Sequence, residues 1–369
     1  MPIQLFKNDL LTIDIGFRYI KVIQLRKKKS GELFIVNYGI GDTPKGCIKN
    51  GAIKDKGKVI AEIMRVINNH NLSAKEAKIV ISGTNIITRI IMINSVDEDE
   101  LKKKVWEDIQ ANLPINLSEH SVDYKILDTV TENNEEKLKV FVTAVPKKII
   151  NSYIEILKEL DLKPAAVDIP SNSVAKFFKN DIVHSEVDSV VKKKKMSKVN
   201  TDTIAVIDMG SETTIVNILK HKTPEFNRVL LMGSSNIDDV IFNDLGLEKH
   251  EVSKSEMYKK MYGIALYRDL NNELEWKCSE AAKKVISEIV KNIKMCFDFY
   301  TTRCGGEQIS RIYLVGGGSQ LKRLDEYYEE VFNIPVFPIN RVAIRGIEYN
   351  NELNTEKINY LVNALGIAM

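Results

Sequence analysis

The chain lacks the long apolar run that a membrane-spanning helix requires. None of its stretches approaches the roughly 18 consecutive apolar residues that such a helix needs. Its first ten residues include Lys7 and Asp9, where a secretory signal peptide needs an uninterrupted apolar segment. We therefore expect a protein that stays in the cytoplasm.

Cysteine, histidine and excess charge are also scarce. The four cysteines form no C-x-x-C pair, and the five histidines have no cysteine or carboxylate partners at ligand spacing, which argues against a protein-ligated metal site. With 53 basic and 50 acidic residues, the net charge of +3 is too small to predict nucleic-acid binding. Only 19 glycines and 9 prolines occur, so collagen-like and low-complexity classes are excluded. The length of 369 residues predicts about two to three globular domains.

What the sequence does contain is a repeat at about half its length. Residues 13–25 (IDIGFRYIKVIQL) and 207–219 (IDMGSETTIVNIL) share five identities in thirteen positions, at an offset of 194 residues. Each copy has an apolar run, the tripeptide Asp-x-Gly and a second apolar run, and a third run follows each copy. The pattern predicts a strand, a tight turn and two further strands in both places.

The two Asp-x-Gly turns have two explanations. A single turn of this kind is expected wherever two strands meet, because Asp and Gly are favoured at turns for backbone reasons alone. Two equivalent copies are better explained if both turns face one ligand. Glycine lets the backbone approach a phosphate, turn N–H groups can bind it, and each aspartate can hold a hydrated Mg²⁺ ion. The repeat thus predicts a nucleotide site that includes Asp14, Gly16, Asp208 and Gly210.

A run of three glycines supports a nucleotide site. Residues 312–315 are typical of a buried strand, Gly316, Gly317 and Gly318 follow, and an amphipathic helix comes next, which Ser319 is expected to cap. Glycines at the carboxyl end of a strand let a ligand lie against the backbone. The chain has neither a Walker loop nor the glycine spacing of a dinucleotide-binding fold.

The order of these three motifs resembles that of the phosphate and adenosine motifs in the actin-like ATPase fold. Within that superfamily the chain is similar to the PilM family of type IV pilus assembly proteins, through residues 97–127 (DEDELKKKVWEDIQANLPINLSEHSVDYKIL) and 296–321 (CFDFYTTRCGGEQISRIYLVGGGSQL). The resemblance covers nearly the whole chain except the section around 183–202. It implies an α/β fold with two duplicated mixed-sheet halves around a nucleotide cleft and a small α+β subdomain inserted in the first half.

The resemblance also assigns roles to individual residues, with ATP or ADP and Mg²⁺ as the implied ligands. Asp14 and Asp208 would hold Mg²⁺ through bound water. Actin-like proteins usually have a small or hydroxyl residue where this chain has Phe17, and Arg18 could supply charge to phosphate there if it points inward. The implied nucleotide-binding set is Asp14, Gly16, Arg18, Lys21, Asp208, Gly210, Ser211, Thr213, Thr214, Gly316, Gly317 and Gly318.

No catalytic residue is predicted. An actin-like ATPase usually places a Gln or Glu near the attacking water, and the strand-to-helix corner at residues 143–147 (TAVPK) contains neither. Without a positioned base, ATP hydrolysis is expected to be very slow if it occurs.

The sequence also predicts a division into five sections. The inserted helix is expected to start with a capping box of Ser95 and Glu98. The Lys-rich section predicts a solvated loop, with a patch attracted to anionic lipid headgroups as the alternative. The sections are 1–85 with 166–182 (first core half), 86–165 (inserted α+β subdomain), 183–202 (Lys-rich loop), 203–235 with 310–369 (second core half) and 236–309 (helical subdomain).

The resemblance implies a scaffold that binds ATP and recruits the N-terminal cytoplasmic tail of a membrane-anchored PilN-like protein at the inner face of the cell membrane. The inserted section at about 84–165 is expected to form one wall of a groove for an extended peptide, with self-association through this section as the alternative. Pilus motor ATPases are further candidate partners. An FtsA-like filament protein would need an amphipathic tail after the final YLVNALGIAM, and a small-molecule kinase would need a carboxylate base that we cannot locate.

Overall fold

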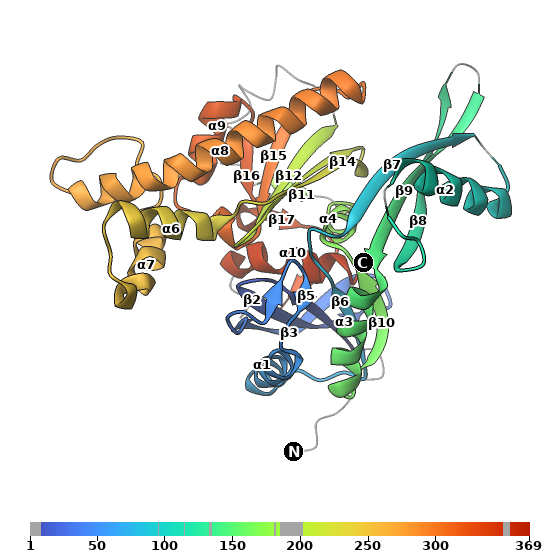
Figure 1. Cartoon of the computed structure of the whole chain (residues 1–369), viewed down its shortest axis with the longest axis horizontal. Coiled ribbons are helices and arrows are strands. Elements are labelled where there is room, and N and C mark those ends of the chain that lie inside the picture. The colour runs from blue at the N-terminus through green and yellow to red at the C-terminus, as the bar shows by residue number, and fades with distance from the viewer. Residues whose placement is uncertain are drawn as a thin grey trace. The chain divides into compact units, whose positions relative to one another are not determined.

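The computed structural model describes residues 9–94, 96–113, 115–132, 135–180, 182–184, 202–349 and 355–369. Most of the predicted Lys-rich loop at 183–202 lies outside these ranges. The chain divides into two compact units, shown with their elements in Figure 1. Unit 1 comprises residues 1–179, 223–227 and 363–369, and unit 2 comprises residues 180–222 and 228–362.

Unit 1 is built on a mixed sheet in which the strands lie in the order β10-β6-β1-β2-β3. β1, β2 and β3 pair antiparallel, as the repeat predicted, whereas β6 runs parallel to both β1 and β10. Alternate residues of β1, including Leu11 and Ile13, are buried in a core shared with α1 and α3. The bounds are β1 (Asp9–Ile15), β2 (Tyr19–Lys27), β3 (Leu33–Asp42), α1 (Lys56–Asn69), β6 (Glu76–Val80), α3 (Lys147–Glu159) and β10 (Lys163–Asp168), with the short β4 (Ile48–Lys49), β5 (Ala52–Ile53) and α4 (Pro170–Phe177).

A second, three-stranded sheet in unit 1 forms the inserted subdomain. Its strand order is β7-β9-β8, with β7 (Ile87–Asn94), β8 (His120–Glu132) and β9 (Glu135–Pro146). Helix α2 (Glu98–Asn112) buries Leu101, Val105 and Ile109, which recur every four residues, against this sheet. The predicted capping box is wrong. The N-cap is Asp97, which directly precedes the first turn and accepts a hydrogen bond from the Glu100 N–H; Ser95 lies outside the described residues.

The inserted sheet ends earlier than the predicted boundary at residue 165. β10 pairs with β6 in the main sheet, and α3 buries Ile149, Tyr153 and Ile156 in the main core. Residues 223–227, at the start of β14, also belong to unit 1. There Thr88 donates a hydrogen bond to Asn227 at 2.9 Å, and Lys139 pairs with Glu225. Residues 363–369, which the sequence analysis assigned to the second core half, belong to unit 1.

Unit 2 repeats the strand pairing of unit 1. Its sheet has the order β14-β13-β12-β15-β16, and β12 is antiparallel to β13 and parallel to β15, just as β1 is antiparallel to β2 and parallel to β6. The duplication inferred from the sequence is therefore present in the strands. Their bounds are β12 (Thr203–Met209), β13 (Thr214–Lys220), β14 (Thr223–Leu230), β15 (Arg311–Val315) and β16 (Val336–Pro338).

Helices make up much of the rest of unit 2. α8, 31 residues long, buries an apolar stripe that includes Ile286, Ile289 and Ile293. None of the described helices has the length and apolarity to cross a bilayer. The remaining bounds are β11 (Ile182–His184), α6 (Ser234–Asp244), η1 (Lys249–Glu251), α7 (Val252–Tyr262), α8 (Glu273–Arg303), η2 (Gly317–Gln320), α9 (Leu324–Phe332), η3 (Ile339–Arg341), β17 (Val342–Ile344), β18 (Ile347–Tyr349), η4 (Thr355–Lys357) and α10 (Ile358–Gly366).

Candidate nucleotide-binding turns

The first Asp-x-Gly turn joins β1 to β2 in unit 1. The Gly16 N–H donates to the Tyr19 carbonyl at 3.0 Å, and the Thr43 hydroxyl donates to the Gly16 carbonyl at 2.7 Å. A Cβ atom at Gly16 would lie 2.8 Å from Lys21 Nζ. The turn is therefore held from both sides, and its glycine leaves room for the lysine.

The buried Asp14 carboxylate forms an ion pair with Lys21, with 2.9 Å between Oδ2 and Nζ. The register of the hairpin brings the two together, since Asp14 lies directly opposite Lys21 on the neighbouring strand. Helix α3 adds Tyr153, whose hydroxyl donates to the Gly51 carbonyl at 3.1 Å. Burial, helped by the nearby charge of Asp14, raises the pKa of Tyr153, so this hydroxyl stays protonated. The ammonium group of Lys21 and the carboxylate of Asp14 are thus held together beside the first turn.

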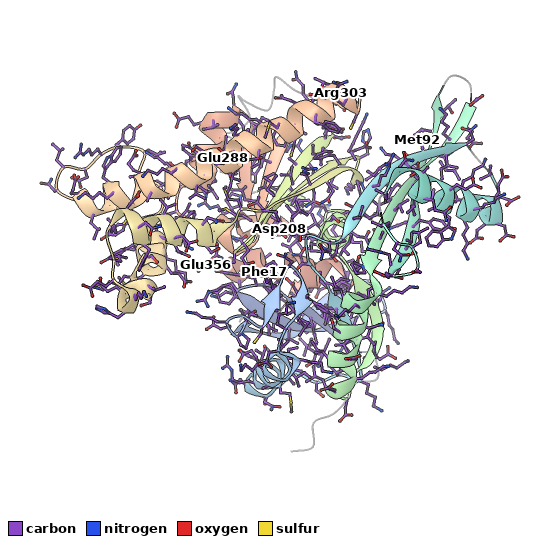
Figure 2. All side chains as sticks on the ribbon, viewed as in Figure 1. Phe17, Met92, Asp208, Glu288, Arg303 and Glu356 are labelled. Atoms are coloured by element: carbon purple, nitrogen blue, oxygen red, sulfur yellow. The ribbon has the colours of Figure 1, made fainter. Side chains whose placement is uncertain are left out.

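The other two residues of this turn, Phe17 and Arg18, are not oriented by the Asp14–Lys21 pair. Phe17 lies between β1 and β2 (Figure 2) and has no polar group for a phosphate. Arg18 pairs with Asp42 at the end of β3, with 3.4 Å between Nη1 and Oδ1, and its guanidinium lies over the Tyr19 ring. Arg18 would have to leave this pair to meet a phosphate, so its predicted role gains no support from the geometry.

The second turn, between β12 and β13 in unit 2, has the same backbone pattern. The Gly210 N–H donates to the Thr213 carbonyl at 2.8 Å, which is again the residue three positions later. The Thr214 hydroxyl donates to the Met232 carbonyl at 2.8 Å. Asp208, labelled in Figure 2, is buried at the end of β12, as Asp14 is at β1.

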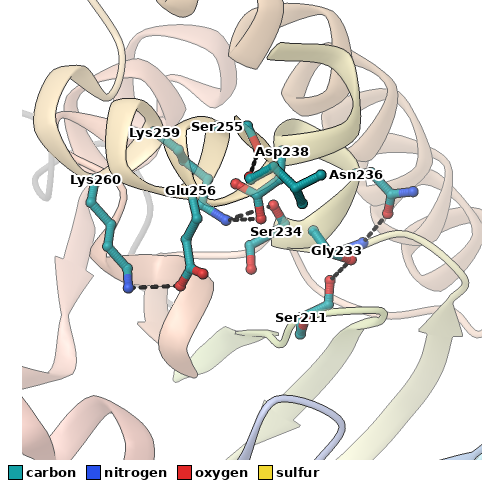
Figure 3. A network of polar contacts seen from close by, with 11 residues as sticks. Ser211, Gly233, Ser234, Asn236, Asp238, Ser255, Glu256, Lys259 and Lys260 are labelled. Carbon is teal, nitrogen blue, oxygen red and sulfur yellow. Dashed lines mark hydrogen bonds and ion pairs between the residues drawn. The ribbon is translucent and has the colours of Figure 1, made fainter. Parts of the chain in front are cut away.

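The second turn is anchored on the first turn of α6 (Figure 3). The Ser211 carbonyl accepts hydrogen bonds from both the N–H and the hydroxyl of Ser235, each at 2.8 Å, and the Ser234 N–H donates to the Gly210 carbonyl at 3.0 Å. A Cβ atom at Gly233 would lie only 2.4 Å from the Ser211 carbonyl oxygen. The repeat did not reveal this contact, because its only sequence signal is Gly233 directly before the helix.

Helix α7 completes this network (Figure 3). The Lys259 ammonium pairs with Asp238 at 2.6 Å and donates to the Ser234 carbonyl at 3.0 Å, and Lys260 pairs with Glu256 at 2.7 Å. Burial raises the pKa of Asp238, although the charge of Lys259 opposes this effect. These contacts tie α7 to the helix that supports the second turn.

The glycine run lies against the second turn within unit 2. β15 is the parallel neighbour of β12, so the two carboxyl ends meet at one edge of the sheet. Gly316 has a φ of +83°, and a Cβ atom there would lie 2.3 Å from Asp208 Oδ1. A Cβ atom at Gly318 would lie 2.6 Å from the Met209 side chain. The structure thus brings the predicted adenosine motif and Asp208 into direct contact.

Ser319 does not have its predicted capping role. Its hydroxyl donates to the Gly316 carbonyl at 2.7 Å, within the short helix η2. α9 begins only at Leu324, after Arg323 in the left-handed conformation, and its N-cap has no side-chain hydrogen bond. A separate turn therefore lies between the glycine run and the amphipathic helix.

The corner at residues 143–147, where an actin-like ATPase was expected to place its Gln or Glu, lies in the inserted subdomain, because β9 belongs to the three-stranded sheet. The corner at the edge that carries Asp14 is the one after β10, since β1 and β10 both run parallel to β6. There Asp168 Oδ1 accepts from the Ile169 N–H and from Asn172, both at 2.8 Å, and Oδ2 pairs with Lys176 at 2.7 Å. Sequence reasoning missed this corner, whose signal is a strand-ending Asp followed by the proline that opens a helix.

The family model described as type IV pilus assembly protein PilM matches residues 12–369. A chain of the PilM-PilN type IV pilus biogenesis complex matches with a TM-score of 0.77 and 18% identity over 97% of each chain. The ethanolamine utilization protein EutJ from Carboxydothermus hydrogenoformans has a TM-score of 0.55 and 12% identity, over 99% of this chain and 90% of that one.

A third solved structure extends the comparison. A diol dehydratase-reactivating factor in nucleotide-free form matches with a TM-score of 0.53 and 9% identity, over 98% of this chain and 99% of that one. At these identities the structural matches inform on fold alone. They show that the chain has the predicted actin-like ATPase fold.

Proposed function

The chain belongs to the PilM family of type IV pilus assembly proteins, and from this membership we propose that it is a nucleotide-binding scaffold that recruits the N-terminal cytoplasmic tail of a membrane-anchored PilN-like protein. The family match over residues 12–369 supports the role in pilus assembly. The solved PilM of similar fold is named for its complex with PilN, which supports this choice of partner. The partner would hold the protein at the inner face of the cell membrane.

We propose ATP or ADP as the ligand of the duplicated turns. The observation that carries this proposal is the contact of Asp208 with the glycine run, where no side chain fits between the Asp208 carboxylate and Gly316. Backbone approach of this kind suits the phosphates and adenosine of a nucleotide. Lys21, held by Asp14, would supply positive charge to a phosphate.

The aspartate of each turn also has the chemistry that Mg²⁺ prefers. Asp14 and Asp208 offer carboxylate oxygens, which are hard ligands that Mg²⁺ accepts directly or through water. When bound, the ion would neutralise phosphate charge. In the part of the chain that the structure describes, no cluster of three metal-ligating side chains occurs.

We place the tail-binding groove along the inserted subdomain. β8, 13 residues long, is an edge strand of the sheet β7-β9-β8 and can add a partner strand through its outer backbone groups. The exposed side chain of Ile126 lies on β8 itself and can contact apolar residues of the tail. Self-association through this subdomain is the competing use of the same edge, and pilus motor ATPases remain further candidate partners.

The first test is capture from membranes. The tagged full chain should retain a PilN-like protein, identified by mass spectrometry, and a synthetic peptide of that protein's cytoplasmic tail should then bind the purified chain. Hydrogen exchange of the complex should show slower exchange at the amides of β8. Retention of only a soluble enzyme, or tail binding without any protection of β8, would contradict the proposal.

A deletion separates the two functions. Ile87 and Ala144 lie directly opposite each other on β7 and β9, so a short Gly-Ser linker can replace residues 88–143 and leave α3 and β10 in the main core. The variant should lose tail binding but keep the rise in melting temperature that Mg-ATP produces. That rise also serves as the control for folding.

A further inference from the structure

The two duplicated turns differ in the charge of one equivalent residue. When residues 13–25 are aligned with residues 207–219, Arg18 in the first turn corresponds to Glu212 in the second. Arg18 is paired with Asp42. Glu212 is exposed at the tip of its turn, and its carboxylate has no hydrogen bond or ion pair among the described residues. The second turn therefore presents a negative charge that no ion pair offsets.

The hairpin of the second turn supplies no cation beside this charge. Asp208 lies opposite an isoleucine on β13, at the position where the first hairpin has its lysine. Within residues 203–220 the one basic residue is Lys220, which lies at the other end of β13 and pairs with Glu307 at 2.8 Å. Partial desolvation raises the pKa of Glu212, and no cation of the described residues counteracts this rise. Phosphates at this turn would therefore meet two carboxylates.

The other polar groups at the tip suit a phosphate once this charge is offset. The hydroxyls of Ser211 and Thr213, on either side of Glu212, have no hydrogen bond among the described residues and can donate to phosphate oxygens. Lys259 reaches the start of α6, which holds this turn, but its ammonium is already paired with Asp238 at 2.6 Å. A divalent cation that accompanies the nucleotide would supply the missing positive charge.

We propose that Glu212 makes nucleotide binding depend on a divalent cation, because its carboxylate repels the phosphates of a free nucleotide and accepts hydrogen bonds from the water of a Mg²⁺ complex. The proposal rests on the nucleotide-binding function above and adds the residue that selects the form of nucleotide bound. Carboxylates bind hydrated Mg²⁺ through its water. Like charges also repel more strongly beside a protein surface than in bulk water. Glu212 thus opposes the free nucleotide and favours its Mg²⁺ complex.

A fluorescent ADP is the probe, and its dissociation constant is measured with the full chain in excess Mg²⁺ and in EDTA. The wild type should bind about thirtyfold more tightly with Mg²⁺, which corresponds to about 2 kcal/mol. Glu212→Gln should bind more tightly than the wild type in EDTA and less tightly in Mg²⁺, so that the ratio of the two dissociation constants falls about tenfold, or about 1.4 kcal/mol. Glu212→Asp keeps the charge and should keep the weak binding in EDTA.

Glu330→Gln is the matched control. Glu330 is an exposed glutamate of α9 in the same unit, and it has no hydrogen bond or ion pair among the described residues. Because β16 runs parallel to β15, the end of α9 returns to the sheet edge opposite the glycine run. Glu330→Gln should therefore change both dissociation constants less than twofold.

The outcomes separate the role of Glu212 from the nucleotide site itself. Equal binding of ADP to the wild type in the two buffers overturns the dependence on a cation. An unchanged ratio in Glu212→Gln, including weaker binding by the same factor in both buffers, overturns the role of Glu212. Either result leaves the nucleotide site standing, whereas failure of ADP to bind the wild type in both buffers overturns the site as well.

Discussion

Gly316 offers the sharpest test of the nucleotide site. Its φ of +83° is a conformation that side chains disfavour, and an added Cβ would lie 2.3 Å from Asp208 Oδ1 and 2.5 Å from the Met209 carbonyl oxygen. Real Cβ atoms essentially never approach so closely, so Gly316→Ala must displace either the Asp208 carboxylate or the backbone at the end of β12. Both displacements alter the proposed phosphate turn.

The backbone strain alone is worth about 1–3 kcal/mol, and the displaced carboxylate adds to it. Gly246 provides a matched control in the same unit, because it also has a positive φ, of +61°, but has no atom within 4 Å of an added Cβ. Gly246→Ala should therefore cost only about 1 kcal/mol of backbone strain. The difference between the two variants reports the contacts of the added Cβ with Asp208 and Met209, together with the less favourable backbone conformation of Gly316.

The assay is the rise in melting temperature on addition of Mg-ATP. A ligand at 100 times its dissociation constant stabilises by about 2.7 kcal/mol, which corresponds to roughly 5–10 °C for a unit of this size. Gly316→Ala should lose most of this rise, and Gly246→Ala should keep it despite a lower melting temperature. A full rise in Gly316→Ala would refute the assignment of the glycine run to the nucleotide site.

The duplicated core could be predicted from the sequence because its signal is local. Asp-x-Gly between two apolar runs determines a strand, a turn and a strand, and the same turn fixes the hydrogen bond from Gly16 to Tyr19 and from Gly210 to Thr213. The pairing of Asp14 with Lys21 also follows from the hairpin register once the turn is known. Two copies of a local pattern were enough to predict both turns.

The parts that the sequence did not predict depend on which strands become neighbours. The corner after Asp168 belongs to the sheet of Asp14 only because β10 pairs with β6, a contact between residues more than 80 positions apart. The corner at 143–147 looks similar locally but ends a strand of another sheet. Helix starts are ambiguous for a different reason, since Ser95 and Asp97 are both good caps and only the backbone of the folded chain selects Asp97.

Three further predictions follow from single contacts. Asp97→Ala should destabilise α2 by about 1 kcal/mol, seen as a lower melting temperature that Asp97→Asn largely avoids. Burial raises the pKa of Cys278 and of Cys296 to about 11, so native protein at pH 8 should be alkylated by iodoacetamide at the exposed Cys304 and spare these two thiols, as mass spectrometry can check. They should become reactive only as the pH approaches 11 or the chain unfolds. ATP turnover should stay below about 1 per second, because residues 168–172 at the β10–α4 corner contain no Gln or Glu and Asp168 already accepts three hydrogen bonds, one from a lysine. A carboxylate held in this way is a poor base for water. Phosphate release faster than this limit and lost in Asp168→Asn would show that Asp168 does act on the attacking water, and the protein would then be a working ATPase.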